Sequence, residues 1–234
     1  MTSFSLVRRL ATACALALLV TAGPALAQER IGVAVDLFTE SATMNGTQSI
    51  QRNGVGQSVD ESFEYTPAGN LGATAWIHFL EGERVRWGPS LRYVGRYRTE
   101  EDADDAYDFG TLMEGFLEGE YSLPVVEKVH AVLGVRGGLA LLIPQGDLKK
   151  EIDRLRADDV GVLNVPRTGW LFGLSVGARR ALTESLAVRA DFRGQWEQLY
   201  LFWTSDEVEG VDVHKRWTTQ GLRFGVTLGL EFVL

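Results

Sequence analysis

Residues 221–234 read GLRFGVTLGLEFVL, and alternate residues in this stretch share one chemical character. Every even-numbered position is apolar: Leu222, Phe224, Val226, Leu228, Leu230, Phe232 and Leu234. Because successive side chains of a β-strand point to opposite faces, this pattern places all seven apolar side chains on one face. The other face carries mostly glycine, threonine and charged residues. A helix would group every third or fourth residue instead, so the segment predicts a two-faced strand.

The same alternation occurs in seven segments upstream, which brings the number of predicted strands to eight. These segments are 31–37, 71–79, 85–98, 109–121, 131–141, 170–179 and 186–197. The pattern places Tyr97 and Phe109 on the apolar face. The segment 109–121 is the least regular, because Leu112 and Phe116 fall on the face that carries its glutamates.

The connections between these strands alternate in length. Short connections lie near 80–84, 122–128 and 180–185, and long polar ones lie near 39–60, 99–108, 143–168 and 203–216. Antiparallel barrels of the bacterial outer membrane have short periplasmic turns and long external loops. The sequence therefore predicts an all-β fold, an eight-stranded antiparallel up-and-down transmembrane β-barrel with both mature ends in the periplasm.

The third long loop contains a candidate helix. Asp147 is placed to cap it, and Leu148, Ile152 and Leu155 recur at helical spacing. We interpret this segment as a short helix that packs on the barrel rim. The alternative is a helix that binds a partner or the membrane surface.

The polar faces decide between a membrane barrel and a soluble one. Their charges lie among many glycines, which suits the crowded interior of a small barrel. Aromatic residues near strand ends suit interfacial girdles: Trp87, Trp170, Tyr200, Trp203 and Trp217. The apolar faces are therefore expected to contact lipid.

The charged residues of the polar faces are expected to line the bore. They are Arg86, Arg92, Arg96 and Arg98, then Glu114, Glu118 and Glu120, then Arg189, Asp191, Arg193 and Glu197, and finally Arg223 and Glu231. Antiparallel neighbours bring opposite charges within reach across the ladder, and isolated buried ions are costly. These groups are therefore predicted to pair and to plug the bore. A narrow conductive path is the alternative.

The N-terminal residues have the layout of a secretory signal peptide. Arg8 and Arg9 precede an apolar run from 10 to 22, and Ala25-Leu26-Ala27 supplies small residues for cleavage before Gln28. We therefore expect residues 1–27 to be removed and 28–234 to form one barrel domain. Cys14, the only cysteine, lies in the removed part, so the mature chain has no disulfide. The net charge of −8 argues against nucleic-acid binding.

In its pattern of strands and loops, segment 28–234 resembles the small outer-membrane barrels of the OmpA transmembrane domain and OmpX type. The final strand resembles the signal read by the outer-membrane assembly machinery in that family, with Gly225, Gly229 and Phe232, although the family commonly ends in phenylalanine and this chain ends in Leu234. The resemblance implies a location in the outer membrane. Outer-membrane lipid, lipopolysaccharide and the assembly machinery are the implied partners, and a monomer is expected.

The sequence gives no convincing catalytic, cofactor-binding or metal-binding residues. His214 lies near Asp212 and Ser205, and with Asp102 and Asp104 it resembles the acid and histidine sets of barrel enzymes that act on peptides or lipid A. The acidic stretch 100–108 lacks the spacing of a calcium loop, so we interpret it as a solvated loop rather than a cation site. We therefore expect a non-enzymatic barrel, without a cofactor, that serves envelope integrity or surface interaction through its long loops. A narrow channel for small or apolar solutes and a rim enzyme are the alternatives.

Overall fold

The computed structural model describes residues 30–52, 55–65, 69–81, 84–101, 105–158, 160–208 and 210–233. In these ranges the elements are β1 (Arg30–Arg52), β2 (Val55–Tyr65), β3 (Asn70–Glu81), β4 (Val85–Glu101), β5 (Asp105–Val126), β6 (Val129–Pro144), α2 (Gly146–Ala157), β7 (Arg167–Ala181), β8 (Leu186–Val208) and β9 (Val211–Val233). None of the helical structure in these ranges is long and apolar enough to cross a membrane. The predicted signal peptide lies outside the described residues.

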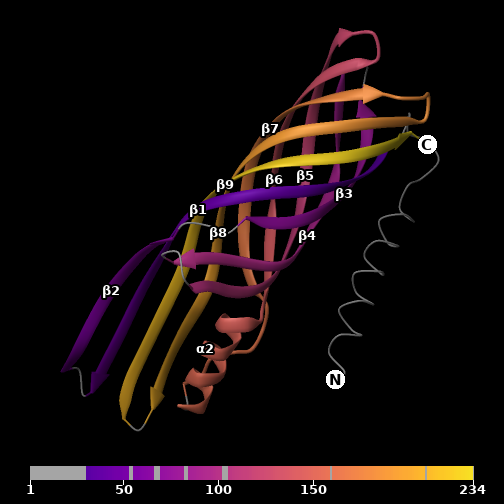
Figure 1. Ribbon diagram of the computed structural model, residues 1–234. Coiled ribbons are helices and arrows are strands. Elements are labelled where there is room, and N and C mark those ends of the chain that lie inside the picture. The colour runs from indigo at the N-terminus through magenta and orange to yellow at the C-terminus, as the bar shows by residue number, and fades with distance from the viewer. Residues whose placement is uncertain are drawn as a thin grey trace, which may run out of the picture.

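The strands form a closed antiparallel ring (Figure 1). Strands β3 to β8 each pair with the next strand in the chain, and β1 closes the ring by pairing with β9 along its whole length. The other edge of β1 pairs first with β3 and then with β2. Strands β2 and β3 therefore act as one interrupted strand, and the ring has eight strand positions. This confirms the predicted up-and-down barrel.

The apolar side chains point away from the barrel, and the charged ones point into it. On β9, Leu228 is 61% exposed, whereas Arg223 on the opposite face of the same strand is 2% exposed. Phe224 and Phe232 are also exposed, and the lumen residue Glu118 is buried. A soluble barrel would have the opposite arrangement, so the wall is built to face lipid.

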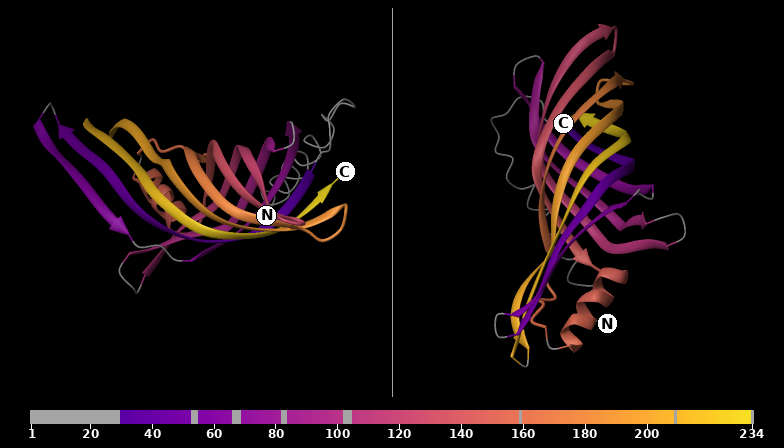
Figure 2. Two further views of the ribbon diagram at one scale, coloured as in Figure 1. Left: turned by 90° about the horizontal axis from the view of Figure 1, so that it is seen from above. Right: turned by 90° about the vertical axis from the view of Figure 1, so that its left-hand side faces the viewer.

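Three of the four predicted long loops are extensions of the strands. The chain near 39–60, 99–108 and 203–216 continues the ladders of β1–β2, β4–β5 and β8–β9. Their last pairs are Arg52 with Val55, Glu101 with Asp105, and Val208 with Val211. Neighbouring strands that are already aligned can continue their backbone hydrogen bonds beyond the membrane, so polar sequence does not end them. Figure 2 shows the β1–β2 and β8–β9 hairpins at one end of the barrel, beside α2. The helix itself occupies the third long connection, as predicted.

Candidate functional site

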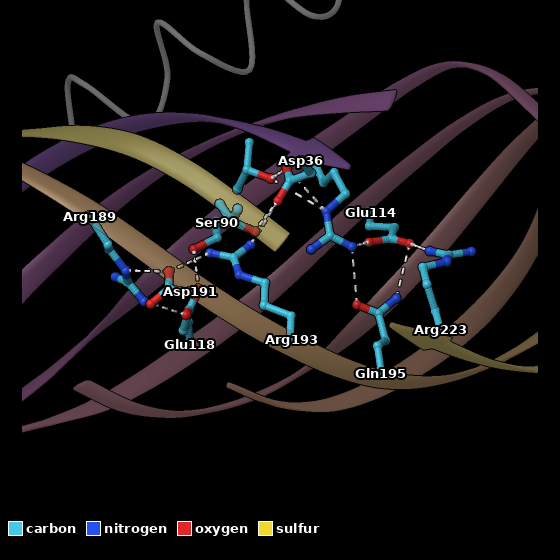
Figure 3. Close-up of polar contacts among 12 residues, drawn as sticks. Asp36, Ser90, Glu114, Glu118, Arg189, Asp191, Arg193, Gln195 and Arg223 are labelled. Atoms are coloured by element: carbon cyan, nitrogen blue, oxygen red, sulfur yellow. Dashed lines mark hydrogen bonds and ion pairs between the residues drawn. The ribbon is translucent and has the colours of Figure 1, made fainter. Parts of the chain in front are cut away.

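The lumen holds an ionic layer of seven arginines and seven carboxylates that are buried in the structure. Its members are Arg86, Arg92, Arg136, Arg179, Arg189, Arg193 and Arg223, together with Asp36, Glu114, Glu118, Glu120, Asp191, Glu197 and Glu231. The charges of this set cancel. Residues from strands on opposite sides of the ring meet here, and Figure 3 shows part of the network.

Glu114 is a centre of this network. Its carboxylate lies 2.8 Å from the Nη1 of Arg92 and also contacts Nη1 of Arg223, which comes from β9 on the far side of the bore. The amide of Gln195 donates a hydrogen bond of 3.1 Å to the same carboxylate. A second carboxylate, Glu197, lies 3.2 Å from Nη2 of Arg223. Each of these four charges therefore has an opposite charge within contact distance, as buried ions require.

Asp36 and Arg189 are the centres of two further clusters. The carboxylate of Asp36 accepts a hydrogen bond of 2.5 Å from the hydroxyl of Thr227 and lies 3.3 Å from Nη1 of Arg193. The guanidinium of Arg189 contacts four carboxylates, at 2.5 Å for Asp191 and 3.5 Å for Glu118. The clusters connect β1, β5, β8 and β9. Pairing across the bore is therefore a property of the whole ring rather than of adjacent strands alone.

The ionic layer is closely packed. Trp76 points into the bore over Gly32, where an added Cβ atom would lie 2.1 Å from the indole ring. The cavity lined by Asp36, Arg92 and Arg193 has a volume of about 10 Å³. A space of that size holds about one water molecule. Glycines on the inner face therefore make room for large side chains, and the bore at this level is filled.

Toward the long hairpins the lumen changes to an apolar layer. It is formed by Phe38, Val94, Tyr97, Phe109, Leu112, Phe116, Ala140, Leu142, Leu171, Leu199, Leu201, Phe202 and Trp217, with Leu148, Ile152, Val160 and Val162 from the third connection. Leu112 and Phe116, the two apolar residues that the sequence pattern places on the polar face of their strand, belong to this layer. Trp217 was predicted to lie in an interfacial girdle, and that prediction was wrong because its ring is buried here.

The helix α2 covers the apolar layer and is held there by polar contacts. Leu148 and Ile152 are fully buried, and Leu155 is partly buried against them. The backbone N–H of Gly161 donates to the carboxylate of Asp206 at 2.7 Å, and the hydroxyl of Thr204 donates to the carbonyl of Gly161 at 3.0 Å. The predicted rim helix is confirmed, and it closes the hairpin end of the lumen.

The N-terminus of α2 differs from the prediction that Asp147 caps it. The helix begins at Gly146, with Gln145 in the capping position, two residues before Asp147. The Asp147 carboxylate instead accepts hydrogen bonds from Lys150 at 2.8 Å and from the backbone N–H of Asp108 at 3.0 Å. These two bonds hold the pKa of Asp147 below its ordinary value. Asp147 thus ties the helix to β5 rather than capping it.

A salt bridge joins the middle of α2 to β9. The Nζ atom of Lys215 lies 3.0 Å from the carboxylate of Glu151. Burial acts to raise the pKa of Glu151, but the hydrogen bond and charge of Lys215, together with Arg154, hold it below its ordinary value. Burial, together with the nearby charges of Glu151 and Asp147, raises the pKa of Tyr107. These charged groups position α2 over the lumen.

A β-bulge in β4 reverses the predicted alternation. The register with β5 shifts between Val94 and Tyr97, and both Gly95 and Arg96 are exposed. Tyr97 is therefore buried in the lumen, and Arg98 lies on the outer wall. The predictions for Arg96, Tyr97 and Arg98 were wrong, because one extra residue moves all later side chains to the opposite face.

A second irregularity on β5 turns Phe109 inward, contrary to the prediction. Gly110 has a φ of +116°, which an L side chain rarely adopts. The ring of Phe109 stacks on that of Tyr97 with centroids 5.5 Å apart. Gly95 and Gly110 are the only signals in the sequence that mark this region, because glycine often marks bulges.

The bulge places two arginines on the outer wall. An arginine on the lipid face costs about 2–4 kcal/mol at the bilayer midplane but about 0–1 kcal/mol near the interface. Arg96 and Arg98 therefore mark the level at which the hydrocarbon layer ends. Regular alternation had predicted both side chains in the bore instead.

Those candidate catalytic residues that the structure describes are not joined into a site by hydrogen bonds. His214 lies opposite Ser49 on β1 and Ser205 on β8, and its side chain is exposed. In the part of the chain that the structure describes, no hydrogen bond joins His214 to Ser205 or Asp212. Asp102 and Asp104 lie outside the described residues.

The described residues also contain no group of three or more histidine, cysteine, aspartate or glutamate side chains arranged to hold a metal ion. Of the acidic side chains in the stretch 100–108, the structure describes that of Asp108. It lies 2.6 Å from Nε of Arg96. The stretch therefore supplies an ion pair to the bulge region.

No protein-family model and no curated protein matches the sequence. Among solved structures, Neisserial surface protein A is 17% identical with a TM-score of 0.40, over 82% of this chain and 95% of that one. The outer membrane protease OmpT from Escherichia coli is 9% identical with a TM-score of 0.44, over 91% and 99% of the two chains. The outer membrane protein OprG from Pseudomonas aeruginosa is 9% identical with a TM-score of 0.41, over 85% and 95%. With its closed ring, apolar wall and charged bore, the chain has the fold of a small eight-stranded transmembrane β-barrel, the fold that its resemblance to the OmpA transmembrane domain and OmpX implied.

Proposed function

We propose that this protein is a non-enzymatic outer-membrane barrel that presents a β-structured platform on the cell surface. The observation that carries the proposal is strand length. Strands β1, β8 and β9 each have 23 residues. About 9–11 tilted residues cross the hydrocarbon core. About half of each long strand therefore stands beyond the lipid.

The platform consists of the outer parts of β2, β1, β9 and β8, which are adjacent in the sheet. Trp203 on β8 is 78% exposed, and Ile50, Val55 and Val59 of the β1–β2 hairpin are also exposed. Exposed aromatic residues are enriched where surfaces bind partners. These features support surface interaction as the role, beside the contribution of the barrel to envelope integrity.

The closed lumen supports a role other than conduction. A solute would have to pass both the ionic layer and the apolar layer covered by α2. Planar-bilayer recording of the refolded protein is expected to show no regular conductance steps. Steps of reproducible size would instead support the narrow-channel alternative.

The arrangement of His214 supports a non-enzymatic role. His214→Ala is expected to leave lipid A composition and peptide cleavage unchanged in cells that express the protein. A change in either profile would support the rim-enzyme alternative.

Biogenesis follows from the same proposal. Residues 1–27 would direct export and be cleaved before Gln28, and the assembly machinery would bind the final strand. The mature monomer would then lie in the outer membrane among lipid and lipopolysaccharide. The long hairpins would face outward and both ends would lie in the periplasm.

A labelling experiment tests this topology. The mature chain is expected to lack cysteine, so Glu207→Cys near a hairpin tip and Glu184→Cys in a short turn give matched single sites, both exposed. On intact cells a membrane-impermeant maleimide should label the first variant and not the second. Labelling of Glu184→Cys alone, or a protein that stays soluble and monomeric without detergent, would contradict the proposal.

A further inference from the structure

The outer wall has a groove where the interrupted strand meets β4. Its volume is about 630 Å³. The apolar part of the groove is lined by Val35, Leu71, Ala73 and Tyr93. The polar part, toward the long hairpins, is lined by Arg96 and Arg98. The apolar side chains belong to the lipid-facing wall, so the groove is continuous with the surface that contacts acyl chains.

The groove is a consequence of the break between β2 and β3. The ladder between β3 and β4 ends at Gly72 opposite Val94. Beyond that point the backbone of β4 forms hydrogen bonds with the side-chain amide of Asn70 instead of with the backbone of a neighbouring strand. Its Nδ2 donates to the carbonyl of Arg98, and its Oδ1 accepts from the N–H of Arg98, both at 3.1 Å. The wall is thereby kept closed while glycines at 69, 72 and 95 leave it hollow.

The bulge in β4 places both Arg96 and Arg98 on the wall of this hollow. The Arg96 side chain is 59% exposed, and its Nε is held by the carboxylate of Asp108 at 2.6 Å. Regular alternation would have placed both side chains in the lumen with Arg92. The bulge therefore removes two positive charges from the neutral ionic layer and places them above an apolar groove. A charge on a lipid-facing wall is stable only at the level of the headgroups.

We propose that this groove binds a phosphorylated glycolipid of the outer leaflet. An acyl chain would lie against Leu71, Ala73 and Tyr93, and a headgroup phosphate would lie between Arg96 and Arg98. Arginine suits this role because its planar N–H fork matches the oxygens of a phosphate. The inference rests on the proposed outward orientation of the hairpins, which places the groove in the outer leaflet.

Native mass spectrometry of the full mature protein, refolded and loaded with lipid A, tests the site. After detergent exchange the wild type should retain lipid A and should lose it when the lipid is dephosphorylated. The variant Arg96→Gln with Arg98→Gln should retain at least about tenfold less, because losing one charge-assisted hydrogen bond already costs about that factor. Inorganic pyrophosphate should not displace the lipid, because it lacks the acyl chains.

A matched pair of arginines provides the control. Arg156 on α2 and Arg216 on β9 lie at the same end of the barrel, and both are exposed and outside the groove. Replacing both by glutamine removes the same charge and should leave retention unchanged. Equal retention by the groove variant and the wild type would overturn the proposal, as would equal retention of dephosphorylated lipid.

A second variant tests the groove without changing its charge. Ala73→Trp should fill the apolar part and reduce retention, whereas Ala190→Trp, on the exposed wall of β8, should not. If Ala73→Trp folds and retains lipid A like the wild type, the acyl-chain part of the proposal is wrong. Heat-modifiable migration and the labelling of Glu207→Cys report on the barrel and its orientation separately. A failure of this site is therefore distinguishable from a failure of the proposed function.

Discussion

In the half of the lumen toward the short turns, arginines and carboxylates meet, whereas toward the long hairpins the same bore is filled by aromatic and aliphatic side chains. The ionic half is built from the strands alone and joins opposite walls of the ring. The apolar half needs a separate element, α2, to cover it. The difference indicates that the first half is stabilised by pairing and the second by packing, and that each will respond to a different kind of change.

The largest effect is expected from removing a shared carboxylate in the ionic half. Glu114→Ala would leave Arg92 and Arg223 without their common partner, and breaking a buried ion pair costs about 3–5 kcal/mol. Urea unfolding of the barrel in lipid vesicles, followed by tryptophan fluorescence, measures this change. Glu184→Ala, in an exposed turn, should change the free energy of unfolding by less than about 0.5 kcal/mol. A similar small value for Glu114→Ala would show that the network does not depend on pairing.

The apolar half should respond locally. Ile152→Ala removes a fully buried side chain, with a cost of about 2–4 kcal/mol. Because α2 can separate while the strands stay paired, the cost should appear as opening of the helix rather than of the barrel. Hydrogen exchange in α2 should rise by about 30-fold or more, and exposed Arg156→Ala should have little effect. Equal acceleration of exchange in β7 and β9 would contradict the separation of the two halves.

The ionic half was predictable from sequence because its charged residues occupy the alternate positions that the strand pattern assigns to the inner face. Arg92, Glu118 and Arg223 each occupy the face opposite an apolar stripe, and each is buried in the bore. Pairing between adjacent strands, such as that of Arg92 with Glu114, was also predictable, but partners across the bore were not. The contact of Glu114 with Arg223 joins β5 to β9, and it depends on the closure of the ring rather than on any local spacing.

The apolar half was harder to predict, because an apolar residue on a barrel strand can face either the lipid or an apolar layer inside the lumen. Leu112 and Phe116 broke the pattern and so gave a warning, but Trp217 did not. The bulge at Gly95 then shifted the parity of Tyr97 and Arg98. The candidate lipid site is made by that shift, and a period of two cannot reveal an inserted residue.

A change at Gly110 tests whether the irregular backbone of β5 maintains the apolar half. Its φ of +116° disfavours alanine, and an added Cβ would lie 2.2 Å from the carbonyl oxygen of Ile143. Gly110→Ala should therefore cost about 1–3 kcal/mol. Gly115→Ala on the same strand is a matched control, since no atom beyond its chain neighbours lies within 4 Å of its added Cβ. If both variants unfold at the same urea concentration, the backbone at Gly110 does not constrain the apolar layer.

The smallest expected effect concerns the pH dependence of α2. The pKa of Glu151 in the docked helix lies below the ordinary value of 4.5, so its pair with Lys215 stabilises docking above about pH 4.5. The contribution is lost as the pH falls through the docked pKa, because the protonated carboxyl no longer attracts the ammonium group. Its size should be below about 1 kcal/mol, since the pair is partly exposed. Hydrogen exchange in α2 should therefore accelerate modestly on acidification, after correction for the intrinsic rate. Lys215→Met should remove this acceleration, and the control Lys128→Met, at an exposed site, should preserve it. An unchanged pH profile in Lys215→Met would assign the acid sensitivity to Asp147 instead.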